Sequence, residues 1–139
     1  MKIEFFVPEI RGKGRPRLTR NGHAFTDEKT RNYENLVKLL AMQAMEKAGA
    51  TVTDKPVRAI INAYFEIPKS YSKKRIKTIL DGKEFPTKKP DLDNIVKEID
   101  GCNKIIFKDD SQIYSITATK TYCKPDEKHG VLFAFEWED

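Results

Sequence analysis

The chain has 139 residues, which is enough for one domain with its own hydrophobic core and too few for two ordinary domains. Charged residues make up 34% of the sequence, the net charge is +5, and no stretch approaches the length of a membrane span. Residues 1–7 lack the long apolar run of a signal peptide, so we expect a cytoplasmic protein without a membrane partner.

The first half of the chain predicts a strand, a basic loop and a long helix. Residues 2–7 predict a strand that ends before a proline. Glycine and proline punctuate the basic segment that follows, which we expect to lack regular structure until about Arg17. Thr26 or Asp27 can cap a helix, and apolar residues then recur at helical spacing until Gly49 ends the run.

The next part of the chain predicts a strand followed by two short helices. Residues 57–67 alternate between apolar and mixed positions, which is typical of a strand with one buried face. Residues 72–80 predict a short basic helix capped by Ser70 or Ser72. A second short helix should begin around Asp93 and end at Gly101.

Two closing strands complete the predicted elements. They cover roughly residues 112–122 and 131–137, and we expect the polar loop of residues 124–130 to join them as a hairpin. The elements together predict an α+β fold in which helices pack on a mixed β-sheet, within a single small domain over residues 1–139.

The cysteines and histidines of the sequence favour free thiols and do not favour a zinc site. Cys102 and Cys123 fit a reducing compartment, although one disulfide between them is an open alternative. The two histidines, His23 and His129, stand at scattered positions that do not resemble the spacing of zinc ligands.

Basic residues gather in two blocks on either side of the long helix and the first central strand. Residues 11–20 contain five basic residues and no acidic one, and residues 69–89 contain eight basic residues against Asp81 and Glu84. Such blocks favour a polyanionic partner, although a lysine-rich surface can also serve solubility. The predicted DNA-binding residues are Lys13, Arg15, Arg17, Arg20, Lys73, Lys74, Arg75, Lys88 and Lys89.

The densest signal for chemistry is an acidic motif directly after the second basic block. Asp91 and Asp93 lie two residues apart, and on an extended chain this spacing directs both carboxylates to one side. Pro90 favours extended backbone before Asp91. Lys97 stands one helical turn beyond Asp93 and returns to the same face. These residues can converge on one bound group.

A second acidic pair, Asp109 and Asp110, stands just before the first closing strand. Three or four carboxylates repel one another unless a hard cation neutralises them. Mg²⁺ prefers oxygen ligands and retains several waters, and Mn²⁺ accepts similar ligands. The sequence therefore predicts Asp91, Asp93, Asp109 and Asp110 as metal ligands.

Each part of the motif also has a plainer explanation that the spacing leaves open. Asp93 could cap a helix, residues 109–111 could form a solvated turn, and Lys97 could be an ordinary surface lysine. An EF-hand calcium loop is excluded, because Ile95 stands at the third ligand position and Val96 replaces the required glycine.

Several segments match one family pattern. They are Lys89-Pro-Asp-Leu-Asp-Asn94 followed by Lys97, the later Phe107-Lys-Asp-Asp-Ser-Gln-Ile113, and the opening segments Gly12-Lys-Gly-Arg-Pro-Arg17, Ala24-Phe-Thr26 and Lys29-Thr-Arg31. From about residue 3 to 122 the chain resembles the RusA family of Holliday junction resolvases. It departs from the family pattern in the stretch from Lys97 to Asp109, which is slightly shorter.

The resemblance implies a RusA-like fold and an endodeoxyribonuclease that resolves four-way DNA junctions in recombination and repair. Within it the catalytic residues are Asp91, Asp93, Lys97 and Asp110, with Asp109 as the neighbouring acid. The implied cofactor is Mg²⁺. A junction needs two symmetric cuts, so the resemblance also implies a homodimer with one site in each subunit.

Three other functions remain as alternatives. The same carboxylates could serve a Mg²⁺-dependent nuclease that acts on flaps or other branched DNA. A non-catalytic junction-binding protein would need the basic blocks but not the aspartates, so retention of the aspartates counts against it. An RNA-binding module is disfavoured, because no aromatic-rich recognition motif is present.

Overall fold

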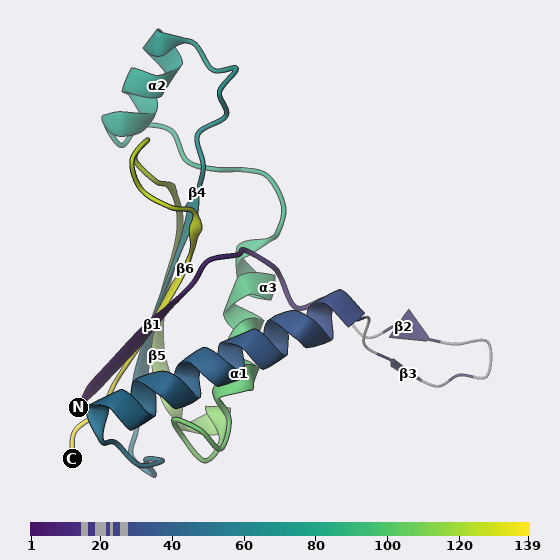
Figure 1. Cartoon of the computed structure of the whole chain (residues 1–139), viewed down its shortest axis with the longest axis vertical. Helices are drawn as coiled ribbons and strands as arrows, with labels where there is room; N and C mark the ends of the chain where they lie inside the picture. The colour runs from purple at the N-terminus through teal and green to yellow at the C-terminus, as the bar shows by residue number, and fades with distance from the viewer. Residues whose placement is uncertain (15–16, 19–21, 23, 26–27) are drawn as a thin grey trace.

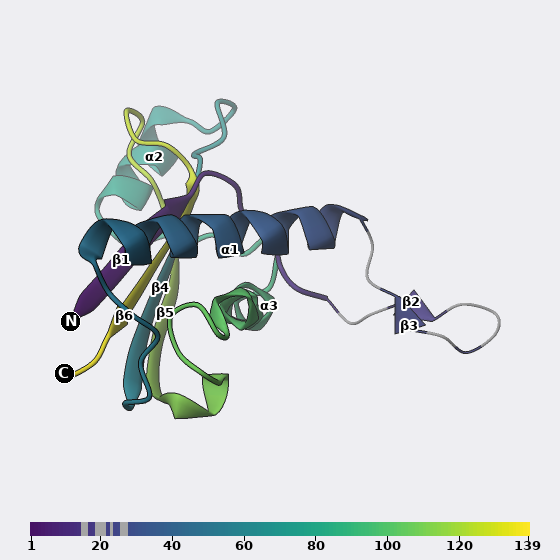
Figure 2. The same cartoon turned by 60° about the horizontal axis from the view of Figure 1, so that its bottom comes forward.

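The computed structural model describes residues 1–14, 17–18, 22, 24–25 and 28–139. These residues form a four-stranded mixed sheet with helices on one face, which confirms the predicted α+β fold class (Figures 1 and 2). The strands lie in the order β1 (Lys2–Val7), β6 (Gly130–Glu136), β4 (Val57–Phe65) and β5 (Ile113–Tyr122). Two short strands, β2 (Arg17–Leu18) and β3 (Ala24–Phe25), form a separate antiparallel pair.

The sheet has one buried face, and the predicted alternation sets it. In β4 the side chains of alternate residues from Val57 to Phe65 are buried, and those between them are half-buried or exposed. Val131, Phe133 and Phe135 of β6 bury the same face. Strand β4 ends at Phe65, two residues before the predicted end, because the following segment runs into Pro68.

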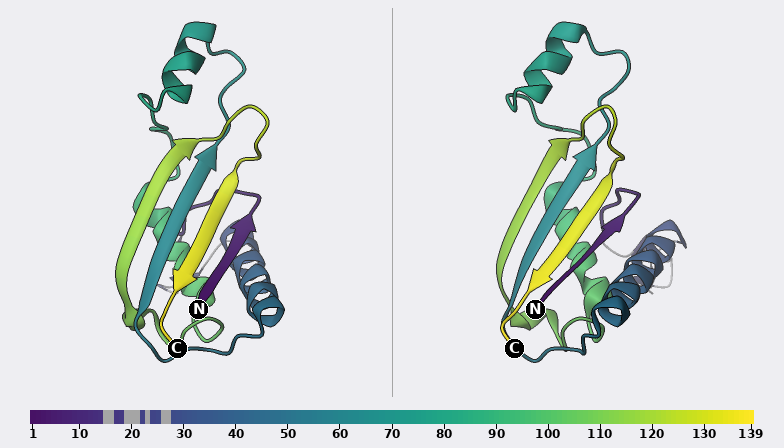
Figure 3. Two further views of the ribbon diagram at one scale, coloured as in Figure 1. Left: turned by 90° about the vertical axis from the view of Figure 1, so that its left-hand side faces the viewer. Right: turned by 60° about the vertical axis from the view of Figure 1, so that its left-hand side comes forward.

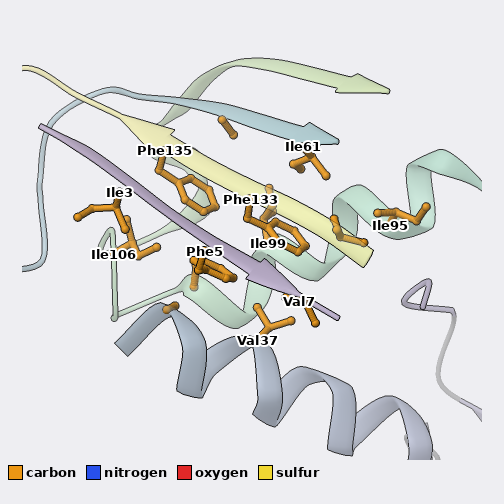
Figure 4. Packing of buried hydrophobic residues seen from close by; sticks show 14 of the residues in the cluster. Ile3, Phe5, Val7, Val37, Ile61, Ile95, Ile99, Ile106, Phe133 and Phe135 are labelled. Carbon is orange, nitrogen blue, oxygen red and sulfur yellow. The ribbon is translucent and has the colours of Figure 1, made fainter. Parts of the chain in front are cut away.

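Helix α1 (Glu28–Ala48) covers the buried face of the sheet. Tyr33, Val37, Ala41 and Met45 recur every fourth residue and form its buried stripe. Figure 4 shows Val37 directed toward Phe5 and Val7 of β1. The helix ends where Gly49 adopts a φ of +65°, as predicted. The predicted capping residues, Thr26 and Asp27, lie outside the described residues.

A short helix, α2 (Lys73–Leu80), stands away from the body of the molecule beyond one end of the sheet (Figures 1 and 3). The Ser72 hydroxyl accepts a hydrogen bond from the Arg75 backbone N–H at 3.2 Å, which confirms the predicted cap. The Arg75 guanidinium lies 3.6 Å from the Tyr71 ring centre and 3.1 Å from a Glu84 carboxylate oxygen. These contacts fasten α2 to the residues just before it and to the loop after it.

The second predicted short helix is present, in two parts. It begins as α3 (Leu92–Val96), one residue before the expected start, and continues as a 3₁₀ helix, η1 (Lys97–Cys102). Ile95 and Ile99 pack into the core beneath the sheet (Figure 4). A second 3₁₀ turn, η2 (Asp110–Gln112), leads into β5.

The two closing strands do not form the predicted hairpin. Strand β4 lies between them, parallel to β5 and antiparallel to β6 (Figure 3). The connecting residues 123–129 are more numerous than the roughly two to five of an ordinary hairpin loop, which allows the chain to cross the end of β4. The stretch from residue 66 to residue 112 is therefore the crossover between two parallel strands, and it contains every predicted catalytic residue.

Candidate active site

Asp91 enters the site on extended backbone, as Pro90 predicted. It is the N-terminal capping residue of α3, with φ −66° and ψ 145°, yet its side chain makes no capping hydrogen bond. The Asp91 side chain is 54% exposed, and its carboxylate lies 3.4 Å from the ammonium of the exposed Lys89. The carboxylate is therefore directed toward solvent with room for further ligands.

Asp93 and Lys97 lie on helical rather than extended backbone. Because α3 begins at Leu92, Asp93 occupies its first turn, and the two-residue spacing from Asp91 does not place both carboxylates on one side as it would in a strand. Both Asp93 and Lys97 are exposed. The Lys97 ammonium donates to the Asn94 side-chain oxygen at 3.3 Å.

The adjacent acids Asp109 and Asp110 have separate roles in the structure. Asp109 caps η2, because its carboxylate accepts the Ser111 backbone N–H at 3.0 Å. A hydrogen bond from the Ser111 side chain, followed by the one from its backbone, lowers the pKa of the Asp109 carboxyl, because both favour the charged form. The Asp109 side chain is thus already engaged by the backbone, whereas that of Asp110 points to other acids.

Asp110 lies against Asp100, a residue that the sequence analysis did not assign to the site. A side-chain hydrogen bond with Asp100 is the first cause of a raised pKa of the Asp110 carboxyl, and the loss of solvent and repulsion by nearby carboxylates add to it. Asn103 also bonds to Asp110 and acts in the opposite direction. Two carboxyls in contact share a proton readily, and they can bind a divalent cation in its place.

Asp100 is in turn held by the basic loop near the N-terminus. The Lys13 ammonium lies 3.2 Å from an Asp100 carboxylate oxygen and 3.1 Å from a Glu34 carboxylate oxygen. The Lys13 backbone N–H donates to the Asn94 carbonyl at 2.9 Å. Lys13 therefore links the loop to α1, α3 and η1 together.

Gln112 fixes the loop that carries Asp109 and Asp110. Its side-chain oxygen accepts the backbone N–H groups of Lys108 and Asp109 at 2.8 and 3.0 Å. Its amide nitrogen donates to the carbonyls of Thr53 and Lys55, both at 3.0 Å. All four bonds bind backbone, so the glutamine clamps the acidic turn to the segment before β4.

The predicted carboxylates do not gather into one ready-made metal cluster. Asp91, Asp93, Asp109 and Asp110 are all described, and among the described residues no three His, Cys, Asp or Glu side chains lie close enough to hold one ion. Magnesium is commonly held by one or two carboxylates together with waters and substrate phosphates. The contacting pair Asp100 and Asp110 fits that smaller donor set, and Asp91 is exposed but does not form a cluster with them.

The predicted DNA-binding residues fall into three groups. Arg15, Arg20 and the side chain of Arg17 lie outside what the structure describes. Lys73, Lys74, Lys88 and Lys89 are exposed. Lys13 and Arg75 are engaged in the ion pairs given above.

Asp91, Asp93, Asp109 and Asp110 are all exposed at the surface. A hollow beside the chain termini and another beside α2 are lined by none of these aspartates. Exposed carboxylates suit a substrate as large as duplex DNA.

Across the described residues, no helix has the length and apolar character needed to cross a bilayer. Cys102 and Cys123 are free thiols, as expected.

Comparison with known proteins places these residues in one family. The chain matches the family model of endodeoxyribonuclease RusA over residues 8–127, a range that contains all the aspartates discussed above. It is also 37% identical over 116 residues to a Bacillus subtilis (strain 168) protein named uncharacterized protein YqaN, and the match covers 79% of this chain and 80% of that protein. The chain belongs to the RusA family of endodeoxyribonucleases.

Proposed function

We propose that this protein is a divalent-metal-dependent endonuclease that resolves four-way DNA junctions by paired cuts, in recombination and repair within the cytoplasm. The match to the RusA family over residues 8–127 carries the proposal. Exposed carboxylates and exposed lysines, with Lys89 directly beside Asp91, support it, because they offer metal ligands and phosphate contacts.

The proposed metal is Mg²⁺, with Mn²⁺ as a substitute. Asp91, Asp93 and Asp110 are the proposed ligands, and Asp100 joins them because its carboxyl contacts that of Asp110. Since no three of these carboxyls lie close enough to hold one ion among the described residues, the proposal requires them to draw together when the ion and the DNA bind. Asp109 is a weaker candidate, since its carboxylate already accepts the Ser111 N–H. When bound, the ion would lower the pKa of an attacking water and offset charge on the scissile phosphate.

The chain's own residues supply binding and orientation. Lys97 would hold a phosphate oxygen. Its side chain is exposed at the start of η1, and its ammonium donates to the Asn94 side-chain oxygen at 3.3 Å. Lys73, Lys74, Lys88 and Lys89 would contact backbone phosphates on either side of the cut. These contacts carry no base information, so the shape of the junction would decide the substrate.

A homodimer is part of the proposal. Resolution of a four-way junction requires two symmetric cuts, and one chain supplies a single set of carboxylates. A two-fold axis through the junction centre would bring a second set to the opposite strand.

The test compares a mobile synthetic four-way junction with a matched linear duplex, each with Mg²⁺ or with EDTA. We expect symmetric nicks in the junction with Mg²⁺, no cleavage with EDTA, and little cleavage of the duplex. The Asp91→Asn protein should bind the junction as well as the unsubstituted protein and cleave it at less than about 1% of the rate, because a metal ligand is lost.

Other outcomes would contradict the proposal. Preferential cleavage of flaps would replace junction resolution with another structure-specific nuclease. Tight junction binding without any cleavage, in Mg²⁺ and in Mn²⁺, would replace it with non-catalytic binding. A fully active Asp91→Asn protein would remove that residue from the site.

A further inference from the structure

Lys120 occupies a position in β5 where the fold would be expected to place an apolar side chain. It pairs with Ala63 of β4, and paired residues of neighbouring strands direct their side chains to the same face. Ala63 is fully buried on the core side of the sheet. The Lys120 side chain is therefore directed toward the helical layer, which contains α3.

The Lys120 ammonium binds the loop directly before Asp91. It donates to the Lys88 carbonyl at 2.6 Å and to the Pro90 carbonyl at 3.0 Å, and it lies 5.1 Å from the centre of the Phe65 ring. A charged donor on two carbonyls forms strong hydrogen bonds, and the aromatic face adds an attraction for the cation. The two carbonyls flank Lys89, so the contact fixes the chain on both sides of that residue.

The Asp91 carboxylate has few contacts of its own, although the Asp91 carbonyl accepts the N–H groups of Asn94 and Ile95 at 3.1 Å. The Asp91 side chain makes no capping bond to α3, and its ion pair is with Lys89, whose side chain is 87% exposed. Pro90, whose carbonyl Lys120 binds, is joined directly to Asp91. Holding the Pro90 carbonyl therefore sets where the Asp91 carboxylate leaves the backbone.

We propose that Lys120 is a positioning residue for the active site, which holds the 88–90 loop so that Asp91 presents its carboxylate to the metal ion. This inference rests on the proposed function, because it assigns Asp91 a metal ligand's role. Strand β5 would then serve the site at two points, since it follows directly from the η2 turn that carries Asp110 and holds the approach to Asp91 through Lys120.

The first experiment measures metal binding without catalysis. Mn²⁺ is titrated into the full chain, and paramagnetic broadening of the backbone amide signals of residues 91–94 is followed by NMR. In the Lys120→Met protein we expect half-maximal broadening to need about 10- to 100-fold more Mn²⁺, the usual cost of losing a group that orients a metal ligand. Lys120→Arg should recover most of that loss, because it keeps the charge and the N–H donors.

The second experiment measures junction cleavage by the same proteins at saturating and limiting Mg²⁺. For Lys120→Met we expect kcat at a fixed, limiting Mg²⁺ concentration to fall by about 10- to 100-fold, with KM for the junction within about twofold of the unsubstituted value. Two controls should behave like the unsubstituted protein. Thr119→Val alters the neighbouring residue, whose hydroxyl bonds to Asn62, and Lys124→Met removes an exposed lysine just beyond β5.

Four results would overturn the positioning role. They are unchanged Mn²⁺ broadening in the Lys120→Met protein, the absence of broadening near Asp91 in the unsubstituted protein, a raised KM with unchanged metal dependence, and self-association as the only effect. A raised KM would indicate that Lys120 contacts DNA. Self-association alone would indicate that Lys120 is an inward-pointing charge that keeps the edge strand β5 from pairing with another chain. If the unsubstituted protein binds Mn²⁺ at residues 91–94 but cuts no junction, the proposed function fails while the Mn²⁺ titration still decides the role of Lys120.

Thermal unfolding shows whether Lys120→Met folds. If it does not, the unsubstituted protein provides the decisive measurement, because ammonium protons held by two carbonyls exchange slowly with water and give a separate ¹⁵N-correlated signal at low temperature. We expect that signal from Lys120 and its absence from the exposed Lys124. Rapid exchange of the Lys120 ammonium would contradict the contact on which the inference depends.

Discussion

At the scale of single residues, the two adjacent acids at the start of β5 are distinguished by their partners. The Asp109 carboxylate accepts the Ser111 N–H, whereas the Asp110 carboxyl contacts that of Asp100. Their position before the same strand does not distinguish the two residues, and only the family resemblance predicted Asp110 rather than Asp109 as catalytic. The structure separates a capping acid from one that is available to a metal ion.

Substitution of the two acids should therefore have different effects. Asp110→Asn should lower cleavage by orders of magnitude with little change in the thermal midpoint, because it would remove a proposed metal ligand. Asp109→Ala should lower the thermal midpoint and cleave more slowly, and Asp109→Asn should restore both, because its side-chain oxygen can still cap η2. Cleavage rates and thermal unfolding of the three proteins test this, and equal loss of cleavage in Asp109→Asn and Asp110→Asn would contradict the distinction.

Glu98 is a buried acid without a hydrogen-bond partner. It is 1% exposed, and neither carboxylate oxygen has a partner among the described residues. Burial, with repulsion by Glu34 as the next cause, raises the pKa of the Glu98 carboxyl to about 8. At pH values between 4.5 and about 8 the carboxyl is therefore mostly protonated in the folded protein and mostly ionised in the unfolded chain.

The stability of the protein should depend on pH through Glu98. A raised folded-state pKa favours the fold fully below the unfolded value of 4.5, and that contribution is lost as the pH rises toward about 8. Glu98→Gln cannot ionise, so its free energy of unfolding should exceed that of the unsubstituted protein at pH 8 and differ less at pH 4. Urea unfolding across this range provides the measurement, and parallel pH profiles for the two proteins would show that Glu98 does not titrate as described.

At the scale of elements, the N-terminal loop packs closely on the start of α3. A Cβ atom at Gly12 would lie 2.8 Å from the Asn94 Cβ and 2.9 Å from the Pro90 Cβ, both closer than atoms can pack. The next residue, Lys13, forms the ion pairs with Glu34 and Asp100. The basic loop therefore supports the site before any DNA is bound, in addition to its predicted contact with DNA.

Gly12→Ala should displace the loop from α3. We expect a loss of about 1–3 kcal/mol in the free energy of unfolding, the usual cost of overpacking, and a lower cleavage rate because Pro90 and Asn94 flank Asp91 and Asp93. Gly14→Ala is the matched control, since no atom of the described residues lies within 4 Å of a Cβ atom there. Chemical denaturation and junction cleavage are measured for both, and an equal effect of the two substitutions would argue against close packing at Gly12.

The sequence predicted the helices and strands better than it predicted which strands pair with one another. Alternating residues in β4, the repeating stripe of α1 and the Ser72 cap are local patterns, and the structure confirms each of them. The hairpin prediction was wrong because strand pairing depends on which edges are available, and β4 offers an edge to both closing strands. Local patterns do not contain that information.

The site was predicted in part for the same reason. The family pattern indicated Asp91, Asp93 and Asp110, and their role as ligands stays a prediction. Asp100 was treated as the end of a helix, and its contact with Asp110 exists only because η1 and η2 meet in space. Lys120 binds a loop that lies about thirty residues earlier in the chain. The sequence of β5 does not predict this contact, so its hydrogen bonds to Lys88 and Pro90 were found only in the folded structure.

At the scale of the whole molecule, one chain presents one set of carboxylates on an open surface. Paired cutting therefore predicts a sedimentation mass of about twice the 16.0 kDa of the chain. The exposed lysines predict junction binding that weakens steeply between low and moderate salt, because each phosphate contact releases counterions. Analytical ultracentrifugation and binding at several salt concentrations test both, and a monomer that still makes two simultaneous cuts would contradict the dimer.

The candidate site lies within the crossover that joins β4 to β5. We therefore expect the site to form late in folding. Parallel strands pair only after the intervening chain has closed into a loop, so residues 66–112 gain their final arrangement as the sheet is completed. A partly folded chain would expose its aspartates without assembling them, and would not cut DNA before the fold is finished. Helix α2 lies beyond the end of the sheet (Figure 3), so a change of length at this tip would be expected to leave the carboxylates in place.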